Sequence, residues 1–324
     1  MQKKALITGI TGFVGSHLVD YLLTKDVDVH GLLRWRSSIE NISHCMDQVN
    51  LHHGDLTDLP SLIGVLEASS PDYIFHLAAQ SYVPYSFNSP ISTLNVNCQG
   101  TCNLLEAVKM IFGKARSPRI HVCSSSEVYG QVKQEELPIN ENCPLRPASP
   151  YAVSKVAEDM LAFQYWLSWG LDIVRTRLFT HTGARRGEVF ATSNFAKQIV
   201  EIEKGKKSPV IDVGNLDSVR TFMDVQDAVR AYWLLVNKCS AGEVYNIGGE
   251  STMTVGDMLN HLLKHSTVDN IDIKIDPSRL RPSDVTLQIP DTSKFRAITG
   301  WKPEIPFEHT MLDLLNYWRC KLSA

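Results

Sequence analysis

The stretch Ala5-Leu6-Ile7-Thr8-Gly9-Ile10-Thr11-Gly12-Phe13-Val14-Gly15 begins as an apolar strand and ends in a loop whose three glycines have the spacing GxxGxxG. The next residues, 16–24, carry apolar side chains at helical spacing. Glycines let such a loop turn tightly and approach a ligand closely, and the start of the following helix offers N–H groups to a pyrophosphate. The alternative is a plain tight turn. The position of the loop directly after a first strand favours a dinucleotide-binding loop, and its proposed contact residues are Gly9, Thr11, Gly12, Phe13, Val14 and Gly15.

Strands and helices alternate through the first half of the chain. This rhythm predicts an α/β fold with a Rossmann-type, doubly wound parallel sheet. The expected strands are 5–8, 29–33, 49–53, 73–77, 119–124 and 171–178, and the expected long helices are 91–112 and 151–169. We therefore assign residues 1–178 to a dinucleotide-binding domain.

The remaining residues, 179–324, have shorter elements and predict a smaller C-terminal α+β lobe that binds the substrate. Residues 210–248 are expected to return in part to the sheet domain. The expected helices here are 195–204, 225–236, 255–265 and 311–319, and the expected strands are 210–213 and 243–248.

The end of the second strand indicates which nicotinamide dinucleotide would bind. An acidic residue there binds a ribose 2′-hydroxyl, whereas arginine accommodates a 2′-phosphate. The sequence has Arg34, Arg36 and Ser37 and no acidic residue at this point. The alternative is a solvated basic loop, but the pattern favours NADP over NAD. Later strand ends supply Asp55 and Leu56 for the adenine, and Leu77, Ala78 and Ala79 for the ribose and pyrophosphate.

A group of proton-transfer side chains lies downstream of this loop. Tyr151 and Lys155 are four residues apart, so they share one face of a helix. A neighbouring ammonium favours a phenolate, and the pKa of Tyr151 is therefore expected to fall from about 10 towards neutrality. Ser125 and Glu127 add a hydroxyl and a second acid or base. These four residues are the predicted catalytic group, which next to a nicotinamide could perform redox chemistry and elimination.

Bulk properties exclude several classes of function. A net charge of −3 and a charged fraction of 21% do not suggest a nucleic-acid or membrane-surface protein. No apolar run approaches the roughly 20 residues that span a bilayer. Seven dispersed cysteines without a CxxC predict reduced thiols and a cytoplasmic location. Neither these cysteines nor the 11 histidines suggest a metal site.

The order of these motifs resembles that of the extended short-chain dehydrogenase/reductases. The motifs are GxxGxxG, the segments 54–56 (GDL) and 76–79 (HLAA), the serine-rich strand end before Val128, and YxxxK at Tyr151. The resemblance covers nearly the whole chain. Within that family the sequence looks most similar to the GDP-mannose 4,6-dehydratases and the related GDP-4-keto-6-deoxymannose reductases. Segments 34–38, 79–81, 125–127, 185–188, 214–220 and 281–285 support this similarity.

The resemblance implies a role for each catalytic residue. Tyr151 would take the proton of the sugar 4-hydroxyl while hydride passes from C4 to NADP. Lys155 would hold the cofactor ribose, and Ser125 would bind O4. Glu127 would remove the proton from C5, so that the 6-hydroxyl leaves as water and the hydride returns to C6. A carboxylate at this position is what turns an oxidation into an elimination.

The resemblance also implies a site for a GDP-sugar. Arginine suits the pyrophosphate because it makes bidentate contacts. The proposed substrate residues are Ser81, Ser126, Thr180, Arg186, Asn194, Arg220, Arg281 and Asp284.

The sequence leaves two alternative functions open and also predicts an oligomer. The same scaffold could instead act as an oxidoreductase at C4 of a GDP-sugar, either as a GDP-4-keto-6-deoxymannose reductase or as a GDP-heptose 4-dehydrogenase. The second alternative is a catalytically silent nucleotide-binding protein, which the intact Tyr–Lys pair disfavours. The two long helices carry apolar residues on more than one face, which predicts a homodimer or homotetramer formed through a four-helix bundle.

Overall fold

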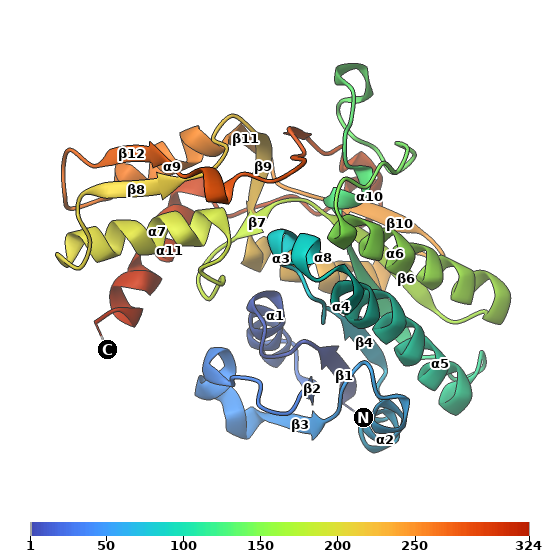
Figure 1. The fold of residues 1–324 in the computed structure, drawn as a ribbon. Helices are drawn as coiled ribbons and strands as arrows, with labels where there is room; N and C mark the ends of the chain where they lie inside the picture. Colours follow the sequence, from blue (N-terminus) through green and yellow to red (C-terminus); the bar gives the residue numbers. More distant parts are fainter. Residues whose placement is uncertain (1, 324) are drawn as a thin grey trace.

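A computed structural model describes residues 2–323, and a sheet of seven parallel strands lies at its centre (Figure 1). In spatial order the strands are β10 (Val244–Ile247), β6 (Ile173–Leu178), β5 (Arg119–Ser125), β4 (Tyr73–His76), β1 (Lys3–Thr8), β2 (Val27–Leu33) and β3 (Val49–His53). The predicted Rossmann-type sheet is confirmed. The chain reverses its direction of growth between β1 and β4, which is the place where such sheets bind ligands.

Helices cover both faces of this sheet, which explains why successive residues of its inner strands, such as β1 and β6, are buried. Ala5 and Ile7 of β1 pack on the face covered by α1 (Phe13–Leu23) and α8 (Val225–Lys238). Leu6, between them, packs on the opposite face, as the alternation of side chains along a strand requires. The helices on that face are α2 (Leu59–Ser69), α5 (Gly100–Phe112) and α6 (Pro150–Trp169).

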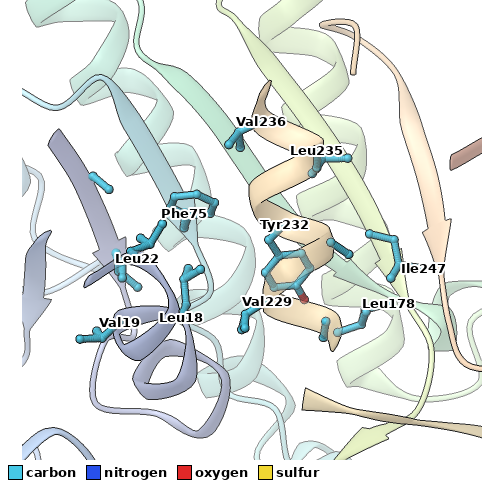
Figure 2. Packing of buried hydrophobic residues seen from close by; sticks show 14 of the residues in the cluster. Leu18, Val19, Leu22, Phe75, Leu178, Val229, Tyr232, Leu235, Val236 and Ile247 are labelled. Atoms are coloured by element: carbon cyan, nitrogen blue, oxygen red, sulfur yellow. The ribbon is translucent and has the colours of Figure 1, made fainter. Parts of the chain in front are cut away.

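Figure 2 shows the packing between α1, α8 and the sheet. Leu18 and Leu22 of α1 lie near Phe75 of β4, while Tyr232 and Leu235 project from α8. All five side chains are fully buried. Helix α8 and strand β10 therefore return to the sheet after an excursion of the chain, whereas the proposed domain boundary at residue 178 stays a prediction.

The predicted long helix at 91–112 is interrupted by one wide turn. It consists of α4 (Pro90–Leu94), a π-helical turn at Asn95–Gln99, and α5. The side chain of Asn97 in this turn is buried and binds both the backbone N–H and the C=O of Gln80, at 2.7 and 3.0 Å. It also donates to the hydroxyl of Ser154 at 2.9 Å. The wide turn thus ties the loop after β4 to helix α6.

The second lobe has a core of its own, built around α7 (Ala191–Glu203), α9 (Val255–Leu263) and α11 (Phe307–Lys321). Its strands are short. The strand predicted at 210–213 is confirmed, whereas the other five were not predicted because so few residues give no clear alternation. The strands of this lobe are β7 (His181–Thr182), β8 (Val210–Val213), β9 (Val219–Asp224), β11 (Ser251–Thr254), β12 (Asp272–Ile275) and β13 (Leu287–Gln288). The remaining helices are α3 (Val83–Asn88) and α10 (Ser293–Thr299), with 3₁₀ segments at Glu40–Gln48, Ser126–Tyr129, Gln134–Glu136 and Pro277–Arg279.

Within residues 2–323, the helices are too short or too polar to cross a bilayer.

Candidate active site

A cavity of about 1100 Å³ lies between the carboxyl ends of the sheet strands and the second lobe. This volume exceeds the roughly 300–1000 Å³ of a pocket for one drug-sized ligand. Loops after β1, β4, β5 and β6 line one side, and segments around β9 and β13 line the other. The cavity is therefore large enough to hold two ligands side by side.

The glycine loop lies at one end of this cavity. Gly9 has a φ of +76°, and a Cβ there would come within 2.9 Å of the backbone N of Ala78. A Cβ at Gly15 would lie 2.2 Å from the carbonyl oxygen of Gly9. The loop thus presses against its own backbone and against the loop after β4, which leaves room for glycine alone. Gly12, Phe13, Val14, Leu77 and Ala79 also line the cavity, as predicted for cofactor contacts.

Six residues proposed for the cofactor do not line the cavity in the part of the chain that the structure describes. Arg34 and Arg36 are exposed, and Ser37 is half-buried, at the end of β2. Leu56 is buried against Gly100, and the Asp55 side chain accepts hydrogen bonds within its own turn. The backbone of Thr11 accepts a hydrogen bond from a side chain after β2. Their roles in cofactor binding stay predictions.

The four predicted catalytic side chains all line the cavity. Ser125 ends β5, and Glu127 lies in the 3₁₀ turn that follows it. The Ser125 hydroxyl accepts a hydrogen bond of 3.2 Å from the backbone N–H of Glu127, which stabilises this turn. Tyr151 and Lys155 lie one turn apart at the start of α6, and both are buried. The structure thus brings a hydroxyl, a carboxylate, a phenol and an ammonium to one cavity.

Helix α6 starts where it does because of its cap. The hydroxyl of Ser149 accepts a hydrogen bond of 3.0 Å from the backbone N–H of Ala152. Pro150 occupies the first helical position, where its missing N–H costs nothing. The cap places Tyr151 in the first turn of the helix, where its side chain lines the cavity.

Lys155 is not free to act on Tyr151 alone. Its ammonium donates to both carboxylate oxygens of Glu158, at 2.8 and 3.0 Å, and to the carbonyl oxygen of Cys123 at 2.8 Å. Burial raises the pKa of Tyr151, and the opposing effects of Lys155 and of the Ser125 hydroxyl do not reverse this shift. The predicted lowering of this pKa is therefore wrong for the ligand-free chain. The role of Glu158 was not predicted, although its i, i+3 spacing from Lys155 is visible in the sequence.

Arg186 lies between two aromatic rings. Its guanidinium is 5.0 Å from the ring centre of Phe13, in the glycine loop, and 4.2 Å from that of Phe190. Phe13 is also stacked on His181, with ring centres 5.7 Å apart. Burial lowers the pKa of Arg186 to about 10, so it stays charged at neutral pH. No carboxylate among residues 2–323 pairs with it, and it can therefore receive an anion. The aromatic partners were not foreseen.

Two other predicted arginines meet at one carboxylate. Arg220 and Arg281 each approach the same oxygen of Asp284, at 3.7 Å. The other oxygen of Asp284 accepts from Asn215 at 2.9 Å and from Ser218 at 3.1 Å. Asp284 thus holds the arginines in place, and the contact with a ribose or base that we predicted for it would have to compete with these bonds.

The other proposed substrate residues also line the cavity, but two of them are already engaged. The Ser126 hydroxyl donates to Gln288 of β13. The Asn194 side-chain oxygen accepts from Arg279 at 2.8 Å. Ser81 and Thr180 complete the set. Gln288 and Arg279 were missed because their partners lie far away in the sequence.

One group of metal-ligand side chains lies outside the cavity. Asp20, His44 and Cys45 offer ligand atoms within 4.8 Å of one another. Asp20 already pairs with His44 and with Arg185, each at 2.7 Å. Its charge is thus matched by the guanidinium of Arg185.

Comparison with known proteins accounts for this arrangement. A family model described as GDP-mannose 4,6 dehydratase matches residues 6–314. The chain belongs to the GDP-mannose 4,6-dehydratase family. Curated relatives agree: a GDP-mannose 4,6-dehydratase of Yersinia enterocolitica is 34% identical, over 97% of this chain and 93% of that protein. A GDP-6-deoxy-D-mannose reductase of Pseudomonas aeruginosa is 32% identical, over 99% of each chain.

Similar solved structures place this chain among the extended short-chain dehydrogenase/reductases. The RMD protein of P. aeruginosa, complexed with NADPH, has a TM-score of 0.84 and 31% identity, and covers 99% of this chain and 100% of that one. A UDP-glucose 4-epimerase of Thermotoga maritima with UDP-glucose has a TM-score of 0.87 and 26% identity, over 98% and 99% of the two chains. The fold is thus shared by enzymes that act on different nucleotide sugars.

Proposed function

We propose that this protein is an NADP-dependent GDP-mannose 4,6-dehydratase that forms GDP-4-keto-6-deoxymannose. The observation that carries the proposal is that Glu127 lines the same cavity as Ser125, Tyr151 and Lys155. Dehydratase relatives that are 34% and 32% identical over 97% of this chain support the choice of reaction. A second acid/base beside the tyrosine is what an elimination needs and a simple C4 oxidation does not.

Each catalytic residue of the cavity has its own role in the proposed reaction. Tyr151 takes the proton of the sugar 4-hydroxyl, and Ser125 orients that oxygen. The resulting C4 ketone acidifies the C5 hydrogen, which Glu127 removes as the 6-hydroxyl leaves as water. Arg220 lies within electrostatic reach of Glu127, whose charge raises the pKa of this guanidinium against the stronger lowering effect of burial.

The glycine loop and the charge of Lys155 fit a dinucleotide at the end of the cavity where this loop lies. Bound NADP would accept the hydride from C4 and return it to C6, with no net consumption. Arg34, Arg36 and Ser37 would hold its 2′-phosphate. Lys155 would bind its ribose by giving up one of its three present hydrogen bonds. The NADPH in the related RMD structure supports this cofactor.

The unpaired charge of Arg186 suits a pyrophosphate of the GDP-sugar. The rings of Phe13 and Phe190 flank the guanidinium and limit its movement in the cavity. Arg220 and Arg281 lie on the opposite side of the cavity and would contact the nucleotide end of the same substrate.

The decisive experiment is incubation of the purified protein with GDP-mannose and no added NADPH. We expect a product that has lost one water and carries a 4-ketone, seen by mass spectrometry and NMR. Tyr151→Phe should abolish formation of this product. Equal turnover by the variant and the unmodified protein would show that Tyr151 is not catalytic. Glu127→Gln should block loss of water while hydride transfer to the cofactor persists in a single turnover.

A second candidate is reduction of a GDP-4-keto-6-deoxy sugar. It is favoured by one observation: the reductase of P. aeruginosa matches this chain over 99% of both lengths. This reaction would consume NADPH in proportion to a keto substrate and would give no product from GDP-mannose alone.

We also propose a homodimer or homotetramer formed through α4, α5 and α6. These helices lie side by side (Figure 1). Large apolar side chains on them are exposed, among them Ile91, Met110, Leu167 and Trp169. Exposed apolar surface of this kind is typical of an interface. A cytoplasmic location is consistent with the seven cysteines, which are all free thiols.

A further inference from the structure

The Lys155–Glu158 pair is the most unusual charged group of the site. The side chains are 5% and 1% exposed, so neither charge is solvated by bulk water. The ammonium of Lys155 has three hydrogens, and its three hydrogen bonds go to the two Glu158 oxygens and to Cys123 O. None of these bonds goes to Tyr151 or points to a ligand. The charge that should favour a phenolate is thus balanced by another carboxylate.

One further charge acts on Glu158 among the described residues, because Asp159 raises its pKa. Asp159, next to it in the helix, is bound by Arg175 and Arg177 of β6. Burial raises the pKa of the thiols of Cys98, in the π-helical turn, and Cys123, in β5, so both stay neutral near pH 7.

Two histidines lie on neighbouring strands. Burial lowers the pKa of His76, in β4, and of His121, in β5, to about 3 each. Both are therefore uncharged in the working range. The guanidinium of Arg186 also interacts with Tyr151, and its charge does not depend on Glu158. Lys155 and Glu158 are therefore the two opposing charges that act on Tyr151 from its own helix.

Lys155 and Glu158 have opposite effects on the pKa of Tyr151. The charge of Lys155 lowers the pKa of Tyr151, and the charge of Glu158 raises it. Burial raises the pKa of Glu158 above its ordinary value, because the site solvates its charge poorly. Tyr151 should therefore ionise more easily when the carboxylate is neutral or absent.

We infer that Glu158 is a positioning residue for Tyr151: it holds the Lys155 ammonium as its counter-ion, and loss of its negative charge frees Lys155 to stabilise the Tyr151 phenolate. The inference rests on the proposed role of Tyr151 as the base, and it adds a residue that sets when this base is active. Glu158 itself does not line the cavity among the described residues, so it acts through Lys155.

The test measures the ionisation of Tyr151 directly, without substrate or cofactor. Phenolate absorbance is recorded within milliseconds of a pH jump, before the chain can unfold. The signal of Tyr151 is the difference between a protein and its Tyr151→Phe counterpart. Glu158→Gln keeps the shape of the side chain, and we expect it to lower the Tyr151 midpoint by about one pH unit. This corresponds to about tenfold more phenolate at a pH below the midpoint.

A matched control is available on α5. Glu106 and Lys109 form another i, i+3 pair, which lies outside the cavity lining. Glu106→Gln should leave the Tyr151 midpoint unchanged. If Glu158→Gln does not fold, Glu158→Ala is measured instead, because it also removes the charge.

An unchanged or higher Tyr151 midpoint in the Glu158 variant would overturn the inference. A role limited to stability would lower the melting temperature and leave the midpoint in place. Because the titration needs no turnover, it can support or overturn the inference even if GDP-mannose is not the substrate. Where turnover is seen, the acid limb of kcat should move to lower pH by the same amount.

Discussion

Replacing Asp159 by Asn should destabilise the protein while leaving its catalytic side chains intact. Asp159 lies one turn beyond Lys155 in α6 and is fully buried. One of its oxygens binds Arg175 Nη1 at 2.6 Å, and the other binds Arg177 Nε at 2.7 Å. Asparagine would leave two buried guanidiniums without a counter-ion.

The magnitude follows from this geometry. Breaking a buried ion pair by removing one partner costs about 3–5 kcal/mol. With an unfolding entropy of about 2.1 cal/mol/K per residue, 324 residues give roughly 0.7 kcal/mol/K. A loss of about 4 kcal/mol therefore lowers Tm by about 6 °C.

The assay is thermal and urea unfolding followed by circular dichroism. A suitable control is Glu250→Gln, which removes an exposed partner of Arg296. It should change the free energy of unfolding by less than about 1 kcal/mol. A loss below about 1 kcal/mol in Asp159→Asn would show that the two arginines are solvated or re-paired, and would refute the reasoning.

Four further results are expected. Gly15→Ala places a Cβ 2.2 Å from a loop carbonyl, so NADP binding measured by calorimetry should be lost while the fold persists; normal affinity would contradict the cradle. Glu127→Gln should reduce dehydration by about 10²–10⁴-fold, measured as product formed from GDP-mannose; undiminished product would remove Glu127 from the mechanism. Burial lowers the pKa of His76 and His121 to about 3. The unfolded chain binds protons near pH 6.5, so stability falls below that pH, by about 2 kcal/mol for each histidine at pH 5; a urea midpoint that is flat between pH 7 and 5 would contradict this. Leu167→Glu, at a side chain 64% exposed on α6, should convert the proposed oligomer to monomer in sedimentation; unchanged mass would exclude this face as the interface.

Local patterns predicted the part of the site that local structure creates. The glycine spacing, the strand before it and the Tyr151–Lys155 pair all depend on neighbours within one or two turns. Their positions follow from backbone geometry, which the sequence specifies directly. The order of strands and helices likewise predicted the sheet, because parallel strands need helical crossovers.

The fold of the second lobe was predicted less well. Strands of two to six residues, such as β9 and β13, gain their hydrogen bonds from partners remote in the chain. No period in the sequence marks them. The engagement of Ser126 by Gln288 has the same origin, since these residues are 162 positions apart.

The sequence by itself determined the chemical groups of this protein and their spacing along the first domain. The tertiary structure alone decided how strongly each group holds its charge. Burial against β5 made the Lys155–Glu158 pair a closed ion pair and raised the pKa of Tyr151. Folding of the second lobe onto the glycine loop placed Arg186 between Phe13 and Phe190. The physical reason is that solvation and long-range contacts exist only once the chain is packed, whereas helix and strand spacing exist in the sequence itself.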